Sequence, residues 1–319
     1  MKILVAPLNW GLGHASRCVP LVSQFLSEGH EVILGGDGDS LTLLRRQFPK
    51  LRYVYLAPLN LRYSAGRRQV WAMIKALPKI VAWALKDHAL LAAILHEEHI
   101  DRIVSDNRFG LYNQNAECIY MTHQLHIMLP KGWQWLEVFV SRMHARVYTR
   151  FNKVWVPDYE KSENSLAGEL SHPTFKIKYP LSSLQYIGPL SRFSPVSTIS
   201  NHYDTVVVLS GLEPHRTLLE RDLLIRFQYT NEKILVIQGL LSRPSTQIQH
   251  GNITIVPYME DKKLEQALLG AKHIIARSGY STIMDLEALG ILNKAELIPT
   301  PGQPEQEYLA TWIAQKVLF

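Results

Sequence analysis

The 319-residue sequence has little cysteine, no long apolar run, and one extended stretch without acidic residues. Its two cysteines, Cys18 and Cys118, lie far apart without a partner motif, so neither a disulfide framework nor a zinc site is expected. This usage suits a reducing, cytoplasmic setting. No uncharged apolar window reaches the ~18 residues of a membrane-spanning helix. The short apolar N-terminus reads as a first strand rather than a signal peptide.

Acidic residues are absent from Ser40 to Lys86, where ten Lys or Arg residues occur. Trp71 and Trp83 lie in the same stretch. A basic, aromatic-bearing helical segment suits an anionic membrane surface, so we expect a peripheral membrane contact through residues 45–86. A solvated basic face over an ordinary core helix is the alternative. No helix-turn-helix, RNP-like or zinc signature accompanies the charge, and no nucleic-acid partner is predicted.

With 47% hydrophobic and 19% charged residues, the composition is that of a globular protein. Short apolar runs alternate with helical patterns in both halves, which predicts α/β architecture with parallel sheets covered on both faces. Pro78 should kink or break the helical region around it. The predicted strands are 2–7, 31–35, 52–57, 102–105, 117–122, 153–157, 205–209, 233–238, 253–256, 273–276 and 295–298. The predicted helices are 14–27, 41–48, 133–151, 215–227, 264–269 and 281–289, with two more around Pro78.

Periodicity fades between residues 158 and 202, where Pro, Ser and Gly increase, and we place the linker there. The prediction is an N-terminal acceptor-side domain, 1–188, and a C-terminal donor domain, 189–319. Both are Rossmann-like, with their parallel sheets facing a cleft. Ligands of open parallel sheets bind beyond the carboxyl ends of the strands.

Gly11 and Gly13 follow the first predicted strand and open a helix at His14. Two glycines let backbone N–H groups approach an anion, and the helix N-terminus adds positive potential. A dinucleotide fingerprint is disfavoured because Ser16 occupies its third glycine position. His14 is a candidate general base or substrate-positioning donor, with a helix-capping or structural histidine as the alternative.

Two further glycine turns follow strands of the second domain. Ser210-Gly211 is the weaker signal, because strand-to-helix junctions commonly carry glycine. The stronger is Arg277-Ser278-Gly279, where amides are exposed at a helix start that Ser281 or Thr282 could cap.

Asp285 is expected on the first turn of the same helix, where its carboxylate could accept both ribose hydroxyls while the amides hold phosphates. A proline- and glycine-held loop then presents Gln303, Glu305 and Gln306, whose amides and carboxylate suit sugar hydroxyls.

Arg-Ser-Gly-x-x-Thr-x-x-acidic, a proline-bearing loop and a Gln/Glu cluster together resemble the donor site of the MurG-like GT-B glycosyltransferases. The segment 252–261 and the first glycine loop are also similar to that family. The resemblance implies that Asp285 takes the ribose and that the backbone at Tyr258 and Met259 reads the base, like a uracil pocket. It implies that Ser210, Gly211, Ser278 and Gly279 surround the diphosphate, with Arg277 fixing that turn.

By the same resemblance, Gln303, Glu305 and Gln306 face the donor hexose, and His14 lies near the reacting centre. The sequence departs from the family in carrying Asp285 where Glu is usual and in lacking Gly-x-Pro within 290–294. The chain also ends at Phe319, soon after the Gln/Glu helix, so we expect truncation or unusual interdomain packing.

Asp106 and His123 end neighbouring predicted strands and should point into the predicted cleft. They could position an acceptor hydroxyl or support His14; a buried network that closes loops is the alternative. No Asp-x-Asp pair ends a strand, so no metal site is predicted, and helix N-termini would replace the cation.

The leading hypothesis is inverting, metal-independent transfer of a sugar from a nucleotide-sugar to a lipid-linked or membrane-associated hydroxyl acceptor. The resemblance implies that the donor is a UDP-sugar. The nucleotide-sugar is a co-substrate, and no separate cofactor is predicted. A nucleotide-sugar 2-epimerase of the same fold and a non-catalytic nucleotide-sugar-binding protein are the alternatives.

Overall fold

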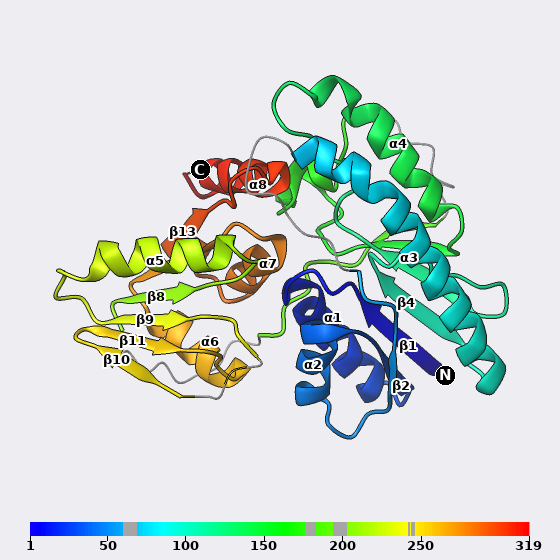
Figure 1. The fold of residues 1–319 in the computed structure, drawn as a ribbon, viewed down its shortest axis with the longest axis horizontal. Coiled ribbons are helices and arrows are strands. Elements are labelled where there is room, and N and C mark those ends of the chain that lie inside the picture. The colour runs from blue at the N-terminus through cyan, green and yellow to red at the C-terminus, as the bar shows by residue number, and fades with distance from the viewer. Residues whose placement is uncertain (60–68, 176–182, 194–202, 242, 244–245, 319) are drawn as a thin grey trace. The chain divides into compact units, whose positions relative to one another are not determined.

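The computed structural model describes residues 1–59, 69–175, 183–193, 203–241, 243 and 246–318. These residues form two compact units (Figure 1). The first contains Met1–Asn9 and His14–Leu190, and the second contains Trp10–Gly13 and Ser191–Phe319. Each unit is built around its own sheet, and the predicted α/β fold class is confirmed.

The sheet of the first unit has seven parallel strands in the order β3-β2-β1-β4-β5-β6-β7. The order reverses at β1, so the carboxyl ends of β1 and β4 form a crevice of the kind that binds ligands in Rossmann folds. The strands are β1 (Lys2–Pro7), β2 (Glu31–Gly36), β3 (Tyr53–Tyr55), β4 (Arg102–Asp106), β5 (Glu117–Met121), β6 (Lys153–Val156) and β7 (Leu184–Tyr186).

Among the described residues, the α-helices of this unit are α1 (Gly13–Ser27), α2 (Gly38–Gln47), α3 (Gln69–Glu97) and α4 (Glu137–Tyr148). The short 3-10 turns η1 (Gln134–Leu136), η2 (Ser162–Asn164) and η3 (Gly168–Leu170) complete the unit. Of the predicted kink or break at Pro78, the break is wrong, because α3 runs through this residue. Pro78 is exposed, so the carbonyl that loses its helical partner can bond to water, while buried Trp83 and Leu91 anchor the helix.

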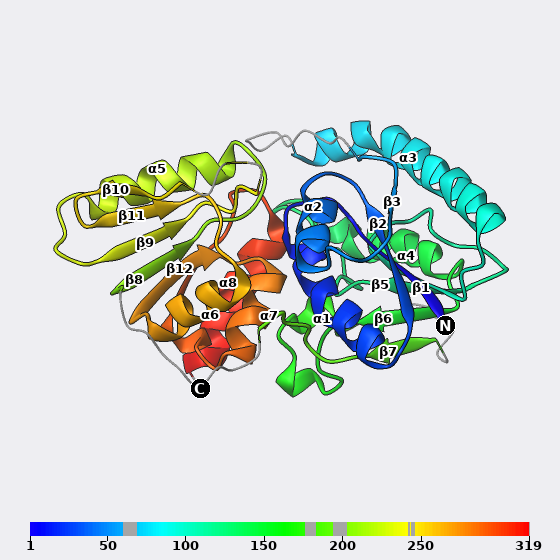
Figure 2. The same cartoon turned by 90° about the horizontal axis from the view of Figure 1, so that it is seen from below.

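The sheet of the second unit has the order β10-β11-β9-β8-β12-β13 and is parallel except for the β10–β11 pair. Its strands are β8 (Thr205–Val208), β9 (Ile234–Ile237), β10 (Ile248–His250), β11 (Ile253–Val256), β12 (His273–Arg277) and β13 (Ala295–Ile298). Its helices are α5 (His215–Phe227), α6 (Asp261–Gly270), α7 (Tyr280–Ala288) and α8 (Pro304–Leu318), with the turn η4 (Leu292–Lys294). In Figure 2, α5 covers one side of this sheet, and α6 and α7 cover the other.

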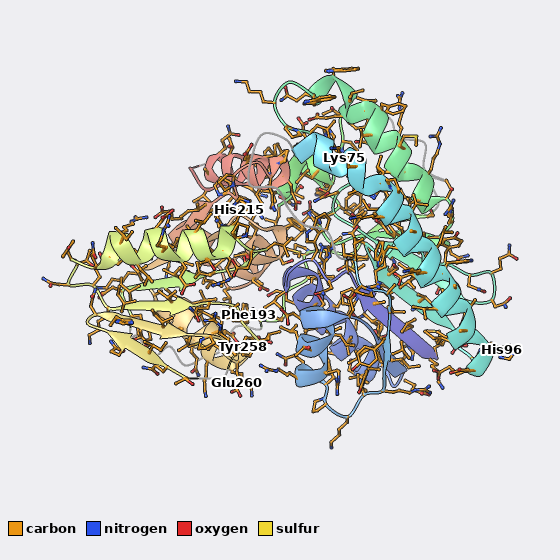
Figure 3. The ribbon with its side chains drawn as sticks, in the orientation of Figure 1. Lys75, His96, Phe193, His215, Tyr258 and Glu260 are labelled. Atoms are coloured by element: carbon orange, nitrogen blue, oxygen red, sulfur yellow. The ribbon has the colours of Figure 1, made fainter. Side chains whose placement is uncertain are left out.

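Figure 3 labels Lys75, in the N-terminal part of α3, and His96, next to its C-terminal residue. No helix among the residues that the structure describes has the length and apolar character needed to cross a membrane.

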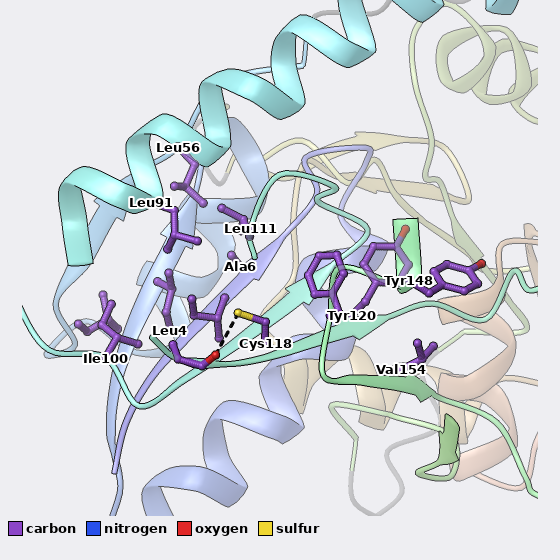
Figure 4. Close-up of a cluster of buried hydrophobic side chains, with 14 of the residues drawn as sticks. Leu4, Ala6, Leu56, Leu91, Ile100, Leu111, Cys118, Tyr120, Tyr148 and Val154 are labelled. Atoms are coloured by element: carbon purple, nitrogen blue, oxygen red, sulfur yellow. Dashed lines mark hydrogen bonds between the residues drawn. The ribbon is translucent and has the colours of Figure 1, made fainter. Parts of the chain in front are cut away.

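The core of the first unit lies between the sheet and its helices (Figure 4). Leu4, Leu91, Cys118 and Tyr120 are fully buried there. Full burial of a Leu side chain contributes about 1.5–3 kcal/mol relative to exposure. Both cysteines are free and buried, so they behave as small apolar side chains. This packing fixes the strand ends from which the polar side chains project.

Candidate active site

At the carboxyl edge of the first sheet, His14 and Asp106 form a close pair. His14 follows the glycine turn at the start of α1, and Asp106 is the last residue of β4. His14 Nδ1 lies 2.9 Å from Asp106 Oδ1. Arg17 Nη2 also lies 3.0 Å from this Nδ1, so the two contacts compete for it. Because an ionised carboxylate only accepts hydrogen bonds, His14 donates to Asp106 in the tautomer that carries the proton on Nδ1, and Nε2 then carries the lone pair. The side chain of His14 is 16% exposed, whereas that of Asp106 is fully buried.

Arg17, which the sequence analysis did not select, completes this cluster from the next turn of α1. Its Nε donates to Asp106 Oδ2 at 2.7 Å, and its Nη2 donates to Asp106 Oδ1. Its Nη1 donates to Nδ1 of His123 at 3.1 Å. Because a guanidinium can only donate, His123 accepts at Nδ1, and a neutral His123 ring carries its proton on Nε2. The structure therefore brings the predicted residues His14, Asp106 and His123 together around an arginine.

The charge state of Asp106 follows from these contacts. Burial alone would raise the pKa of its carboxyl, but the positive charges and hydrogen bonds of Arg17 and His14 hold the pKa well below its usual range. Asp106 is therefore ionised throughout the neutral range. The backbone turns sharply after it, because Asn107 has a positive φ of 58°. Asn107 accepts a hydrogen bond from Tyr120 at 2.9 Å, which fixes this turn.

A second buried arginine, Arg108, lies two residues beyond Asp106. It donates to Asp87 of α3 from Nε at 2.8 Å and from Nη2 at 2.9 Å. Its Nη1 donates to Asp37 at the end of β2 at 2.9 Å, and its Nη2 donates to the Ala57 carbonyl at 2.7 Å. Both Arg108 and Asp87 are fully buried. Arg108 thus joins three other segments of the first unit and has a structural role.

In the second unit, the predicted Arg277-Ser278-Gly279 turn joins β12 to α7. Gly279 is the N-cap residue of α7, and no side chain caps the helix. The prediction that Ser281 or Thr282 caps it is wrong, because both lie inside the first turn of a helix that starts at Tyr280. A Cβ placed on Gly279 would meet no atom within 4 Å. An uncapped helix start beside open space suits an anion.

Arg277 holds this turn from inside. Its Nη1 donates to the Pro299 carbonyl at 2.9 Å and its Nη2 to the His215 carbonyl at 2.8 Å. Burial lowers the pKa of its guanidinium. Ser278 is fully buried and donates to the Gln306 carbonyl at 2.8 Å. The turn is thus tied to the starts of α5 and α8, where His215 (Figure 3) and Gln306 lie.

The Ser210-Gly211 turn leads to a different helix start. Gly211 is exposed and has a φ of +97°, a conformation that favours glycine. The Glu213 carboxylate accepts the backbone N–H of Thr217 at 3.2 Å, in the first turn of α5. The N-terminus of α5 therefore already has an anionic partner. At the N-terminus of α7, by contrast, the N-cap residue Gly279 provides no side chain to cap the helix.

Asp285 lies on the sixth residue of α7, in its second turn rather than the predicted first, because the helix begins directly after Gly279. Asp285 Oδ1 accepts a hydrogen bond from Ser191 Oγ at 2.7 Å. Arg192 Nε lies 3.7 Å from Asp285 Oδ2, and Arg192 Nη1 lies 2.9 Å from Asp261 Oδ1. Burial raises the pKa of Asp285 to about 6, against the opposing effects of Arg192 and Ser191.

Ser191 and Arg192 lie in the predicted linker, where loss of periodicity gave no sign of a site. Nothing in their local sequence distinguishes them from other linker residues.

The remaining predicted donor residues lie in two loops of the second unit. Tyr258 and Met259 are partly exposed between β11 and α6, and Figure 3 shows Tyr258 beside Glu260. Gln303 and Glu305 are partly exposed at the start of α8. Gln306 accepts the backbone N–H of Thr300 through Oε1 at 2.9 Å, which closes the proline-bearing loop.

Gly11 has a φ of +76°, and Gly13 begins α1. Over the described residues, no group of three or more His, Cys, Asp or Glu side chains is arranged to hold a metal ion.

No protein-family model matches the chain. An uncharacterized glycosyltransferase of Methanosarcina acetivorans is 50% identical over 332 residues, covering 98% of this chain and 81% of the relative. Another from the same organism is 24% identical over 338 residues, covering 99% of this chain and 84% of that relative.

Solved glycosyltransferases share the fold at low sequence identity. The glycotransferase of kitacinnamycin has a TM-score of 0.60 at 12% identity, covering 98% of this chain and 84% of its own. CalG4, the calicheamicin glycosyltransferase, has a TM-score of 0.58 at 13% identity, covering 99% and 92%. MurG of Acinetobacter baumannii has a TM-score of 0.50 at 11% identity, covering 99% and 82%.

Proposed function

The chain belongs to the glycosyltransferase family of these archaeal relatives, and from that premise we propose that it transfers a sugar from a UDP-sugar to a hydroxyl acceptor with inversion at the anomeric carbon. The contact between His14 and Asp106 carries this proposal. It orients one histidine nitrogen toward an ionised carboxylate and leaves the other to accept a proton.

In the proposed step, the acceptor hydroxyl gives its proton to His14 Nε2 while its oxygen forms a bond to the anomeric carbon. The bond between that carbon and the diphosphate oxygen breaks, and the nucleoside diphosphate leaves with the electron pair. Asp106 stabilises the imidazolium that forms, because its ionised carboxylate lies 2.9 Å from Nδ1. A single displacement of this kind inverts the anomeric configuration.

On the donor side, we assign the diphosphate to the uncapped start of α7 at Gly279, without a requirement for a metal ion. The exposed amides and the helix dipole supply positive potential there. Asp285 would accept the ribose hydroxyls, and ribose would then replace the Ser191 hydroxyl as its partner. Gln303, Glu305 and Gln306 would bind the sugar, and the backbone at Tyr258 and Met259 the base.

We further propose that the acceptor is lipid-linked and that the protein works at the cytoplasmic face of an anionic membrane. On α3, Leu77, Val81 and Leu85 recur at helical spacing and are 55–62% exposed. Exposed Lys75 and Lys79 lie on the same helix. Trp83, by contrast, is buried and donates to the Ala57 carbonyl, so it belongs to the core.

A second apolar row, near and on α4, supports the same proposal. Trp135, Phe139 and Met143 are 75%, 63% and 45% exposed, and Arg142 and Arg146 are exposed on the same helix. Exposed apolar rows with basic neighbours are typical of helices that lie in a lipid interface. Part of the predicted basic stretch, including Arg62, Arg67 and Arg68, lies outside the described residues.

Flotation with liposomes tests the membrane proposal. We expect the chain to float with vesicles containing about one third phosphatidylglycerol and to float less with neutral phosphatidylcholine vesicles. The variant W135S/F139S/M143S should lose most of this binding. The control L218S/I225S removes exposed apolar side chains from the second unit and should bind normally. Equal flotation of all three proteins would refute the proposal.

The glycosyl transfer is tested with a panel of UDP-, GDP- and dTDP-sugars. Thermal shift identifies the bound nucleotide-sugar, and release of the nucleoside diphosphate with lipid-linked acceptors measures turnover. Binding without turnover would favour a non-catalytic binding protein. Interconversion of the donor sugar without an acceptor would favour a 2-epimerase. If no nucleotide-sugar binds, the donor-site proposal fails.

A further inference from the structure

We propose that Arg17 is a positioning residue that sets the pH range in which His14 can accept a proton. The inference rests on the proposed role of His14 as the base. It is supported by the contacts of Arg17, whose guanidinium donates hydrogen bonds to both oxygens of the Asp106 carboxylate. The same carboxylate contacts His14. The side chain of Arg17 is 1% exposed, so water screens its charge little.

The geometry places two donor nitrogens on one oxygen. Asp106 Oδ1 accepts from His14 Nδ1 and from Arg17 Nη2, and these two nitrogens lie 3.0 Å apart. In a histidine–carboxylate pair without an arginine, the full negative charge of the carboxylate stabilises the imidazolium. Here Arg17 already balances the charge of the Asp106 carboxylate. Protonation of His14 would therefore place a second cation next to a buried one, which is unfavourable.

The other titratable groups around Asp106 do not replace this balance. Cys18 Sγ lies 3.8 Å from Asp106 Oδ2, but burial raises the pKa of this thiol well above its usual range, so it is neutral. Burial also raises the pKa of Tyr120 well above its usual range. His123 accepts from Arg17 at Nδ1. Among these contacts, Arg17 is the permanent cation.

Arg17 thus has two consequences for the proposed base. It fixes the Asp106 oxygen that orients the His14 ring, and it favours the neutral ring whose Nε2 can accept a proton. A purely structural arginine would have only the first consequence. The two roles are separated by measuring protonation rather than stability.

The first test measures His14 protonation directly by NMR of the histidine-ring nitrogens in the full chain. In Arg17→Gln, which loses the charge, we expect the protonation midpoint of His14 to rise by about one pH unit. Arg17→Lys keeps the charge without the fork and should shift it less. If Arg17→Gln does not fold, Arg17→Lys still tests the idea, because any upward shift in it must come from loss of the fork.

The control is Arg102→Gln, which removes an arginine from the other end of β4, where it pairs with Glu117 at 2.6 Å. This variant should leave the His14 titration unchanged. An unchanged midpoint in every folded Arg17 variant would overturn the inference, whether or not the chain transfers a sugar.

The second test is the pH profile of kcat/KM. Its acidic limb should move to higher pH in Arg17→Gln by the same amount as the NMR midpoint, so that activity on that limb falls about tenfold for a shift of one unit. If the NMR midpoint moves and the profile does not, Arg17 acts on His14 but His14 is not the base. That outcome would reject the catalytic role proposed for His14 and, with it, the functional consequence of Arg17.

Discussion

The polar site of the first unit is built from side chains, whereas that of the second unit is built mainly from a helix start and one carboxylate. In the first unit, four side chains from α1, β4 and the segment after β5 form a cluster, buried except for partly exposed His14, in which Arg17 balances the charge of Asp106. In the second, the main elements are an uncapped helix start and a carboxylate held by neighbouring side chains. The first arrangement suits proton transfer, and the second suits binding of an anion and a ribose.

This difference has a mechanistic consequence. A site made of coupled side chains should lose catalysis when one member is removed, whereas a site made of backbone amides should lose affinity gradually. Substitutions in the first unit should therefore change kcat, and substitutions in the second should change donor binding. The predictions below test this separation.

The largest effect is expected for His14→Ala. Loss of the proposed base should lower kcat about 10³-fold, within the range of general base catalysis, while donor affinity stays within a factor of two or so. Asp106 keeps Arg17 as its partner, so no unpaired buried charge results. Release of nucleoside diphosphate and calorimetric titration measure the two quantities. His250→Ala, on exposed β10, is the control. A large loss of donor affinity in His14→Ala would contradict the proposed separation between catalysis in the first unit and donor binding in the second.

Asp285→Asn should have the converse effect. Removal of the charge should weaken binding of the nucleotide-sugar about 10- to 150-fold, because hydrogen bonds to charged groups contribute about 1.5–3 kcal/mol. The saturated rate should change much less. Asp222→Asn is the control, since Asp222 is exposed on α5 of the same unit. Unchanged affinity, measured by calorimetry, would remove Asp285 from the donor site.

Donor affinity should also depend on pH through Asp285. Because its pKa is raised to about 6, the carboxylate is ionised above that pH and protonated below it. Only the ionised form accepts hydrogen bonds with both oxygens, so affinity should be constant above about pH 7 and fall about tenfold by about pH 5. Asp285→Asn should abolish this dependence. A pH-dependent loss that persists in the variant must come from another group.

The smallest effect is expected for Gly279→Ala. Gly279 has an ordinary φ of −74° and open space around a Cβ, so the fold should tolerate alanine with a change in Tm of a few degrees at most. The methyl group would crowd an anion bound at the helix start and weaken donor binding about three- to tenfold. Gly211→Ala, at a φ of +97°, should instead destabilise the protein by about 1 kcal/mol. Normal donor binding by Gly279→Ala would place the diphosphate elsewhere.

Much of the fold was predictable because both units bury their strands on two faces, which produces continuous apolar runs such as residues 3–6 and 234–237. The strands that the sequence analysis missed lack this signal. β10 is exposed along its length, and β7 is a short strand in a segment rich in Ser and Pro. The uninterrupted α3 was missed because local propensity at Pro78 is overridden by core contacts further along the helix.

The site residues also fall into those that could be selected from the sequence and those that could not. Glycine turns and strand ends mark backbone geometry locally, so the Arg277-Ser278-Gly279 turn and the His14 and Asp106 positions could be selected from sequence. Arg17 could not, because a helical arginine is normally solvent-exposed, and its burial depends on a carboxylate 89 residues away. The spacing of Arg17 three residues after His14, on the same helix face, was the available signal.

The Arg108 network limits which substitutions the protein can accept during evolution. Asp37, Asp87 and Arg108 come from three separated segments, yet each charged group is paired with one of opposite charge in the set. Losing Arg108 alone would leave two uncompensated carboxylates, while losing a carboxylate alone would leave a cation short of a partner. The three positions should therefore be inherited as one unit: related sequences should keep all three residues or replace them together by uncharged ones. Sequences with one replaced should be rare, and the effects of single and combined substitutions on stability should be strongly non-additive.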